Sequence, residues 1–85
     1  MSKKPVIFEI VDVECYHGYK ASERPLAFTY REQRWDVDEI LDRWFESGVV
    51  AGYPNLDYFK VRTNEGSVFL LRHNLRYKTW AVRKI

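Results

Sequence analysis

Alternation of apolar and polar residues is the main pattern of this chain, and it is typical of strands with one buried face. In residues 58–63, Phe59 lies on one side of the expected strand and Lys60 on the other. Residues 67–72 are apolar on both sides, which favours a central, fully buried strand. The pattern predicts four further strands, over residues 5–16 (with a bulge near Ile10–Val11), 25–30 and 77–83, and a short one at residues 34–35 that follows a polar break and leads into the next element.

One stretch departs from this alternation. In residues 33–48, five apolar side chains fall at the spacing i, i+3, i+4, i+7 and i+8, which puts them on one face of a helix. Asp36 stands at the N-cap, Glu39 completes a capping box, and Gly48 can end the helix in a left-handed conformation. The spacing therefore predicts a helix near residues 37–47. Its apolar face consists of Val37, Ile40, Leu41, Trp44 and Phe45.

The predicted elements follow the order β-β-β-α-β-β-β in a single domain, residues 1–85. Short connections favour antiparallel neighbours, because a parallel pair needs a long crossover. We therefore predict an α+β fold, mostly β, in which a single curved antiparallel sheet or partly closed small barrel packs on one helix. The predicted core comprises Trp35, Ile40, Leu41, Trp44, Phe45, Phe59, Val61, Leu70 and Trp80.

Composition suits a small domain of this kind. Three Trp, five Phe and six Tyr residues supply apolar area that compensates for the short chain. The one cysteine, Cys15, cannot form an internal disulfide, which favours a reducing compartment. Neither a signal-type segment nor an apolar run long enough to span a membrane is present in the sequence. These features predict a cytoplasmic protein with no membrane contact.

The formal net charge of +2 conceals an uneven distribution. Residues 1–59 contain 7 Lys and Arg against 11 Asp and Glu, a net charge of −4. Residues 60–85 contain 7 Lys and Arg against one Glu, a net charge of +6. The two parts either attract each other within the fold or provide one basic face for a polyanion.

A series of short motifs runs through the middle of the chain. Arg24-Pro25 precedes a strand, Trp-Asp-Val-Asp-Glu-Ile-Leu-Asp-Arg-Trp occupies residues 35–44, and Tyr-Phe-Lys-Val-Arg-Thr occupies residues 58–63 before a hairpin with Gly66. This series resembles a family of short uncharacterised prokaryotic proteins, and a related-looking module is associated with Y-family DNA-damage polymerases. The similarity covers roughly two thirds of the chain and leaves out residues 1–15. It implies a shared fold and a link to nucleic acid, and it brings no catalytic residues.

Few residues can carry chemistry. Cys15 and His17 share one side of a strand, and His73 is distant in the sequence. A zinc site normally has four ligands, and an activated thiol needs a neighbouring base or cation, so neither pattern is complete. A cavity lined by Cys15, His17 or His73 would favour an enzyme. The residues themselves predict a non-catalytic protein with no cofactor or metal, and a solvated face for the carboxylates of the predicted helix.

The main functional prediction concerns the outward side of the C-terminal strands. Cations that alternate along strands beside exposed aromatic rings suit single-stranded nucleic acid, because phosphates bind Lys and Arg while bases stack on rings. The same pattern also fits an ordinary solvated sheet face. The candidate nucleic-acid-binding residues are Tyr58, Lys60, Arg62, Arg72, Tyr77 and Arg83.

The alternative function is protein–protein interaction or homodimerisation. Residues 49–54, Val-Val-Ala-Gly-Tyr-Pro, form an unusually apolar connection. An exposed apolar patch is typical of an interface, whereas the same segment folded over the end of the core has only a structural role. The candidate interaction residues are Val49, Val50 and Tyr53.

Overall fold

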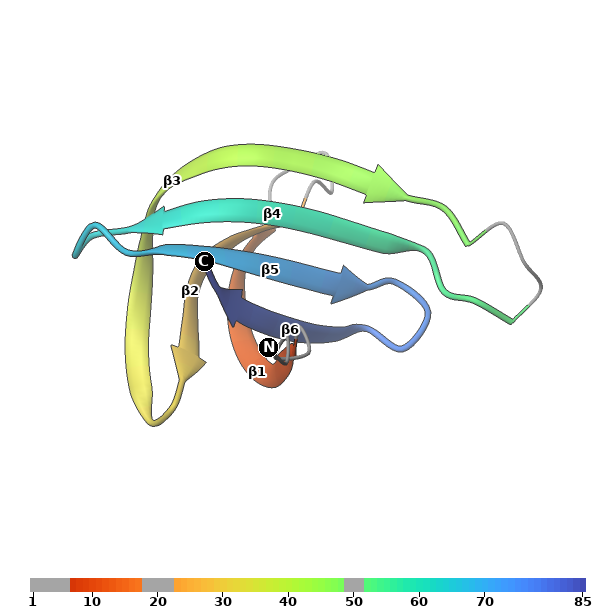
Figure 1. Cartoon of the computed structure of the whole chain (residues 1–85), viewed down its shortest axis with the longest axis horizontal. Coiled ribbons are helices and arrows are strands. Elements are labelled where there is room, and N and C mark those ends of the chain that lie inside the picture. The colour runs from red at the N-terminus through yellow and green to blue at the C-terminus, as the bar shows by residue number, and fades with distance from the viewer. Residues whose placement is uncertain (1–6, 18–22, 49–51) are drawn as a thin grey trace, which may run out of the picture.

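Six antiparallel strands close into a barrel in the computed structural model, which describes residues 7–17, 23–48 and 52–85 (Figure 1). Each strand pairs with the next one along the chain, and the last pairs with the first. The strands are β1 (Glu9–His17), β2 (Glu23–Tyr30), β3 (Gln33–Glu46), β4 (Leu56–Thr63), β5 (Val68–Asn74) and β6 (Thr79–Lys84). The described residues contain no helix, so the fold is all-β and the prediction of an α+β fold is wrong.

Strand β3 occupies the stretch that the sequence predicts as a helix near residues 37–47. It is a 14-residue strand that pairs with two different neighbours in turn. Residues 33–36 pair with β2, and residues 37–46 pair with β4. In Figure 1 the strand rises on one side of the barrel and then curves over β4.

Two β-bulges explain why this strand has the apolar spacing of a helix. The register with β4 shifts between Val37 and Glu39 and again between Ile40 and Asp42. Each bulge adds one residue to the two-residue period of a strand. The residues that face the barrel interior therefore recur three apart, at Val37, Ile40 and Arg43, as they would on a helix.

The residues that indicated helix ends have other contacts in the strand. Asp36 Oδ1 accepts a hydrogen bond from Arg34 Nε at 3.1 Å. Gly48 N donates to Asn55 Oδ1 at 2.9 Å, and a Cβ at Gly48 would lie 2.2 Å from the carbonyl oxygen of Tyr53. A glycine is therefore needed at this position because another backbone segment approaches it, and not because a helix ends there.

The core lies inside the barrel and is centred on Phe69. The Phe69 ring meets Phe28 at 5.0 Å and Tyr30 at 5.5 Å between centroids, both edge-on, and Trp35 at 5.0 Å in a tilted arrangement. Such aromatic contacts supply much of the buried area of a small domain. The buried cluster comprises Phe28, Phe59, Val61, Phe69, Leu71, Trp80 and Val82.

The predicted core is correct for most of its strand residues and wrong for Leu70 and for much of the supposed helix. Leu70 is half-buried and points outward from β5, between the buried Phe69 and Leu71. Phe59, Val61 and Trp80 are buried, and Trp35 and Ile40 pack against the core cluster. Three residues of the supposed helical face are exposed instead, because β3 beyond residue 40 has few neighbours. These are Leu41, Trp44 and Phe45, with exposed fractions of 40%, 40% and 57%.

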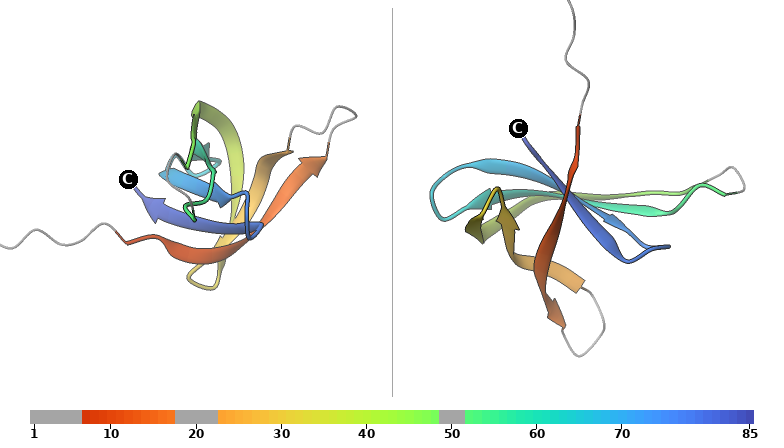
Figure 2. Two further views of the ribbon diagram at one scale, coloured as in Figure 1. Left: turned by 90° about the vertical axis from the view of Figure 1, so that its right-hand side faces the viewer. Right: turned by 90° about the horizontal axis from the view of Figure 1, so that it is seen from below.

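Strand β1 also changes partners along its length. Residues 9–11 pair with β6, whereas residues 12–17 pair with β2. The bulge predicted near Ile10–Val11 lies instead at Glu14–Cys15. Because of this change of partner, the end of the β1–β2 pair diverges from the second half of β3 (Figure 2).

Candidate nucleic-acid interface

The outward side chains of β3, β4, β5 and β6 form a surface that we call the outer face. Residues directly opposite each other in an antiparallel pair share a face, so the register defines its rows. One row runs from Trp44 through Tyr58 to Arg72, and a second runs from Lys60 through Leu70 to Arg83. The outer face is defined as Trp44, Tyr58, Lys60, Leu70, Arg72 and Arg83.

Alternation along β4 fixes the direction of these side chains. Phe59, Val61 and Thr63 are buried in the barrel, whereas the residues between them are only half-buried. Lys60 and Arg83 flank Leu70 on either side, about 10 Å apart at the backbone given the usual strand spacing. The prediction that Tyr58, Lys60 and Arg62 point away from the buried side of β4 is therefore confirmed.

Aromatic rings accompany the cations on the outer face. The Trp44 indole stacks on the Tyr58 ring with 5.1 Å between centroids and 9° between planes. The guanidinium of Arg72 lies 4.1 Å from the centre of the Phe8 ring, just before β1. A groove of about 230 Å³ beside Arg72 is lined by Ile10, Leu56 and Ala81, among others. Flat rings, a shallow groove and neighbouring cations thus occur together.

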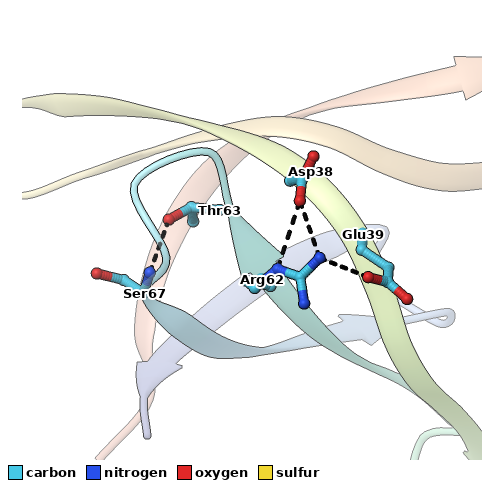
Figure 3. Close-up of polar contacts among 5 residues, drawn as sticks. All are labelled: Asp38, Glu39, Arg62, Thr63 and Ser67. Atoms are coloured by element: carbon cyan, nitrogen blue, oxygen red, sulfur yellow. Dashed lines mark hydrogen bonds and ion pairs between the residues drawn. The ribbon is translucent and has the colours of Figure 1, made fainter.

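Arg62 does not share this arrangement, although it follows Lys60 on the same side of β4. Its Nη2 donates to Asp38 Oδ2 at 3.0 Å and to Glu39 Oε2 at 2.5 Å (Figure 3). The hydrogen bond to Asp38, followed by the charge of Glu39, raises the pKa of Arg62. Two carboxylates therefore balance its charge, in keeping with the expected attraction between the acidic and basic parts of the chain.

The acidic residues of β3 border the outer face on one side. Asp42 lies opposite Lys60, and Glu46 lies beyond Trp44 along the strand. Within residues 7–17, 23–48 and 52–85, no ion pair joins Lys60, Arg72 or Arg83 to a carboxylate. A polyanion would be repelled by the edge of β3 and attracted toward β4, β5 and β6.

The remaining predicted residues lie elsewhere. Tyr77 is 64% exposed in the turn between β5 and β6, with the guanidinium of Arg76 5.4 Å from its ring centre, and belongs to neither row. Tyr53 is 68% exposed. Val49 and Val50 lie outside the described residues.

A cleft lies on the inward side of the sheet, between β1 and the strands that face it. This cleft has a volume of about 700 Å³, and Val11, Val13 and Cys15 line it from β1. The opposite wall includes His73 and Trp80, whose rings stack at 4.1 Å with 2° between planes. Cys15 and His73 thus line one cavity, which is the observation that would favour an enzyme.

Among the described residues, the cleft is not accompanied by a group of side chains that could bind a metal ion. Across the part of the chain that the structure describes, no three His, Cys, Asp or Glu residues gather closely enough to hold a metal ion. The side chain of His17 lies outside that part. No helix capable of crossing a membrane occurs in the described ranges.

Comparison of the chain with protein-family models, with curated proteins and with solved structures found no match. The family resemblance of residues 23–71 therefore stays a prediction, and the proposals on function rest on the geometry of the outer face and the cleft.

Sequence reasoning missed Trp44 on the outer face and Phe8 beside it. Trp44 was assigned to the buried side of a helix, although Asp42, Trp44 and Glu46 alternate with inward residues as they would on a strand. Phe8 was counted within the first predicted strand, and only the fold brings it against Arg72. The two-residue spacing of Asp42, Trp44 and Glu46 was the available signal for Trp44.

Proposed function

We propose that the protein is a binding module that holds single-stranded nucleic acid on its outer face. The observation that carries the proposal is the row Trp44–Tyr58–Arg72, in which a stacked aromatic pair lies directly beside a cation. Bases stack on exposed rings at about 1–3 kcal/mol each, and Lys and Arg side chains bind the phosphates. Small antiparallel barrels are common supports for this kind of binding.

The charges that support the proposal are fewer than the sequence suggests. Lys60, Arg72 and Arg83 stand without an ion pair in the described ranges, whereas Arg62 is held by Asp38 and Glu39. We therefore assign phosphate contact to the first three. The proposal includes a cytoplasmic location, in keeping with the single cysteine of the sequence.

Titration of the protein with a short oligothymidylate, followed by tryptophan fluorescence at two salt concentrations, tests the proposal. Trp44 should be quenched by a stacked base, and the affinity should fall as salt rises, because phosphate contacts release counterions. The paired variant Lys60→Gln/Arg72→Gln should bind weakly. A matched control is Arg34→Gln, which removes a cation that lies away from the outer face and pairs with Glu14 and Asp36.

Two results would contradict the proposal. The first is the absence of binding at low salt. The second is binding that Lys60→Gln/Arg72→Gln and Arg34→Gln weaken equally, since the location of the cation would then not matter.

The second candidate function is protein–protein interaction or homodimerisation through residues 49–54. The observation in its favour is Tyr53, whose ring is 68% exposed beside a segment of apolar sequence. Sedimentation of the wild type and Tyr53→Ser tests the homodimer. A protein that stays monomeric at high concentration excludes it.

A further inference from the structure

Among the described residues, the second half of β3 has a free edge. Residues 37–46 pair with β4 on one side, and within the described ranges no strand pairs with them on the other. Alternate backbone N–H and C=O groups along this edge therefore lack a ladder partner, which is the usual template for adding a strand. Figure 1 shows this half of β3 as the margin of the sheet above β4.

The free edge borders the cleft. The cleft, about 700 Å³ in volume, is lined by Val11 and Val13 on β1 and by Arg43 on β3. Phe45 lies opposite Asp57, an inward position, yet its side chain is 57% exposed. An additional strand beside β3 would turn every second side chain toward Phe45 and the apolar wall of β1, because side chains alternate between faces.

The outward side of the same edge is acidic. Glu39, Asp42 and Glu46 lie opposite Arg62, Lys60 and Leu56 on the outward side of the β3–β4 pair. A strand added to β3 would therefore place its other side chains next to carboxylates. Opposite charges at cross-strand positions stabilise pairing, and like charges oppose it.

A second copy of this chain is a poor occupant of the edge. Antiparallel pairing of two β3 strands with the twofold axis at Asp42 would set Asp42 against Asp42 and Asp38 against Glu46. These like charges protect the edge from self-association, as charged residues on edge strands usually do. The occupant that fits must carry positive charge.

From this charge pattern and the neighbouring cleft, we propose that the free edge of β3, residues 39–46, binds an extended segment of a partner protein in which apolar and basic residues alternate. The segment adds to the sheet as a further strand, so that its backbone supplies the missing hydrogen bonds. Its apolar side chains enter the cleft and its basic side chains lie beside Asp42 and Glu46. This interaction is separate from the proposed binding of nucleic acid.

A fluorescent synthetic peptide with alternating Lys and Val tests the proposal by anisotropy. The control peptide has the same composition in two blocks, all Lys before all Val. We expect the alternating peptide to bind about tenfold more tightly, as several cross-strand pairs together would give. Hydrogen exchange should slow at the backbone amides of residues 39–46 when the alternating peptide is added, because new ladder bonds protect them.

A charge reversal on the protein makes the test specific to the edge. The variant Asp42→Lys/Glu46→Lys should lose affinity for the Lys–Val peptide by about tenfold and gain affinity for an alternating Glu–Val peptide. The matched control is Glu32→Lys/Glu65→Lys, which makes the same change of charge at exposed positions in two turns. The affinity of this control for the Lys–Val peptide should fall by less than about threefold, because charges far from the edge are largely screened by salt.

Three outcomes would overturn the proposal. Equal affinity of the alternating and block peptides would show attraction by charge alone. Bound Lys–Val peptide without slower exchange at residues 39–46 would exclude strand addition. Sedimentation that shows a dimer of the protein, with the same amides protected in the dimer, would assign the edge to a second copy.

Discussion

The carboxylate of Asp57 accepts two hydrogen bonds from the guanidinium of Arg43, from Nε to Oδ1 at 3.3 Å and from Nη2 to Oδ2 at 2.8 Å. Arg43 also lies over the buried Phe59 ring, 4.6 Å from its centre. The side chain of Asp57 is only 13% exposed, whereas that of Arg43 is 46% exposed. The pair therefore joins β3 to β4 at the wall of the cleft and keeps a largely buried carboxylate neutralised.

Replacing Arg43 with Met should lower the free energy of unfolding by about 1–2 kcal/mol, because it leaves the Asp57 carboxylate without its partner. Urea unfolding of the variant measures this change. The control is Arg34→Met, which breaks exposed ion pairs with Glu14 and Asp36 and should change stability by less than about 1 kcal/mol. Equal losses in the two variants would contradict the special role of the Arg43–Asp57 pair.

The same ion pair should make no difference to the pH dependence of stability near neutrality. The hydrogen bond to Asp57 raises the pKa of Arg43 above the usual arginine value. A raised pKa gives stability that is fully present below the unfolded-state pKa and is lost only as pH rises through the folded-state value, in strong alkali. The stability difference between the wild type and Arg43→Met should thus stay constant from neutral to mildly alkaline pH. A difference that falls across this range would contradict the assignment.

Adjacent apolar residues of β3 should respond differently to truncation. Ile40 packs against the core cluster, whereas Leu41 lies at a bulge and is 40% exposed. We expect Ile40→Ala to cost about 1–3 kcal/mol and Leu41→Ala less than about 1 kcal/mol. A helix in this stretch would bury both side chains, so comparable losses on urea unfolding would contradict the strand. Far-ultraviolet circular dichroism of the wild type should likewise lack a helical signature.

Gly48→Ala should destabilise the protein by about 1–3 kcal/mol, because the new methyl group would clash with backbone atoms that cannot move away without disturbing the fold. Its Cβ would lie 2.2 Å from the carbonyl oxygen of Tyr53 and 2.9 Å from that of Pro54. The comparison variant is Gly52→Ala, where a Cβ meets nothing within 4 Å and the only strain comes from φ of +93°. We expect a smaller loss there, of about 1 kcal/mol. Thermal unfolding measures both losses. A smaller loss of stability for Gly48→Ala than for Gly52→Ala would contradict the close approach of the Tyr53 carbonyl to Gly48.

Arg62 should contribute little to nucleic-acid binding. Its guanidinium is already bound by Asp38 and Glu39, so Arg62→Gln frees two carboxylates as it removes one cation. We expect Lys60→Gln to reduce the slope of log affinity against log salt by about one, and Arg62→Gln to leave it nearly unchanged. Oligothymidylate titrations over a range of salt concentrations measure both slopes. A full unit lost on Arg62→Gln would place Arg62 among the phosphate contacts.

Much of the C-terminal half could be predicted from the sequence. Residues 58–63 alternate without a bulge, so Phe59 and Val61 face inward and Lys60 faces outward, as simple parity predicts. The turn at Gly66 has φ of +86°, a conformation that glycine adopts readily, and this agrees with the hairpin predicted there. Regular pairing of β4, β5 and β6 keeps parity intact, and the outward direction of Lys60 and Arg72 follows from it.

The helix prediction failed because periodicity alone does not separate a helix from a doubly bulged strand. Val37 and Ile40 are three apart in both cases, and Asp36 fits a capping box as well as it fits a strand partner of Ala27. Only long-range pairing with β4 reveals the bulges. For the same reason, the sequence does not predict that Trp44 lies on the outer face, or that it stacks there on Tyr58.

The two irregular points of β3 have a consequence for how this chain can change in length. When a regularly paired strand gains or loses one residue, every side chain after that point moves to the other face of the sheet. At Asp38 and at Leu41 the ladder already carries a surplus residue, so shortening the chain by one at either point restores plain alternation and keeps Arg43 and Phe45 turned inward. Single-residue deletions should therefore be better tolerated at these two bulges than within the regularly paired residues 42–45.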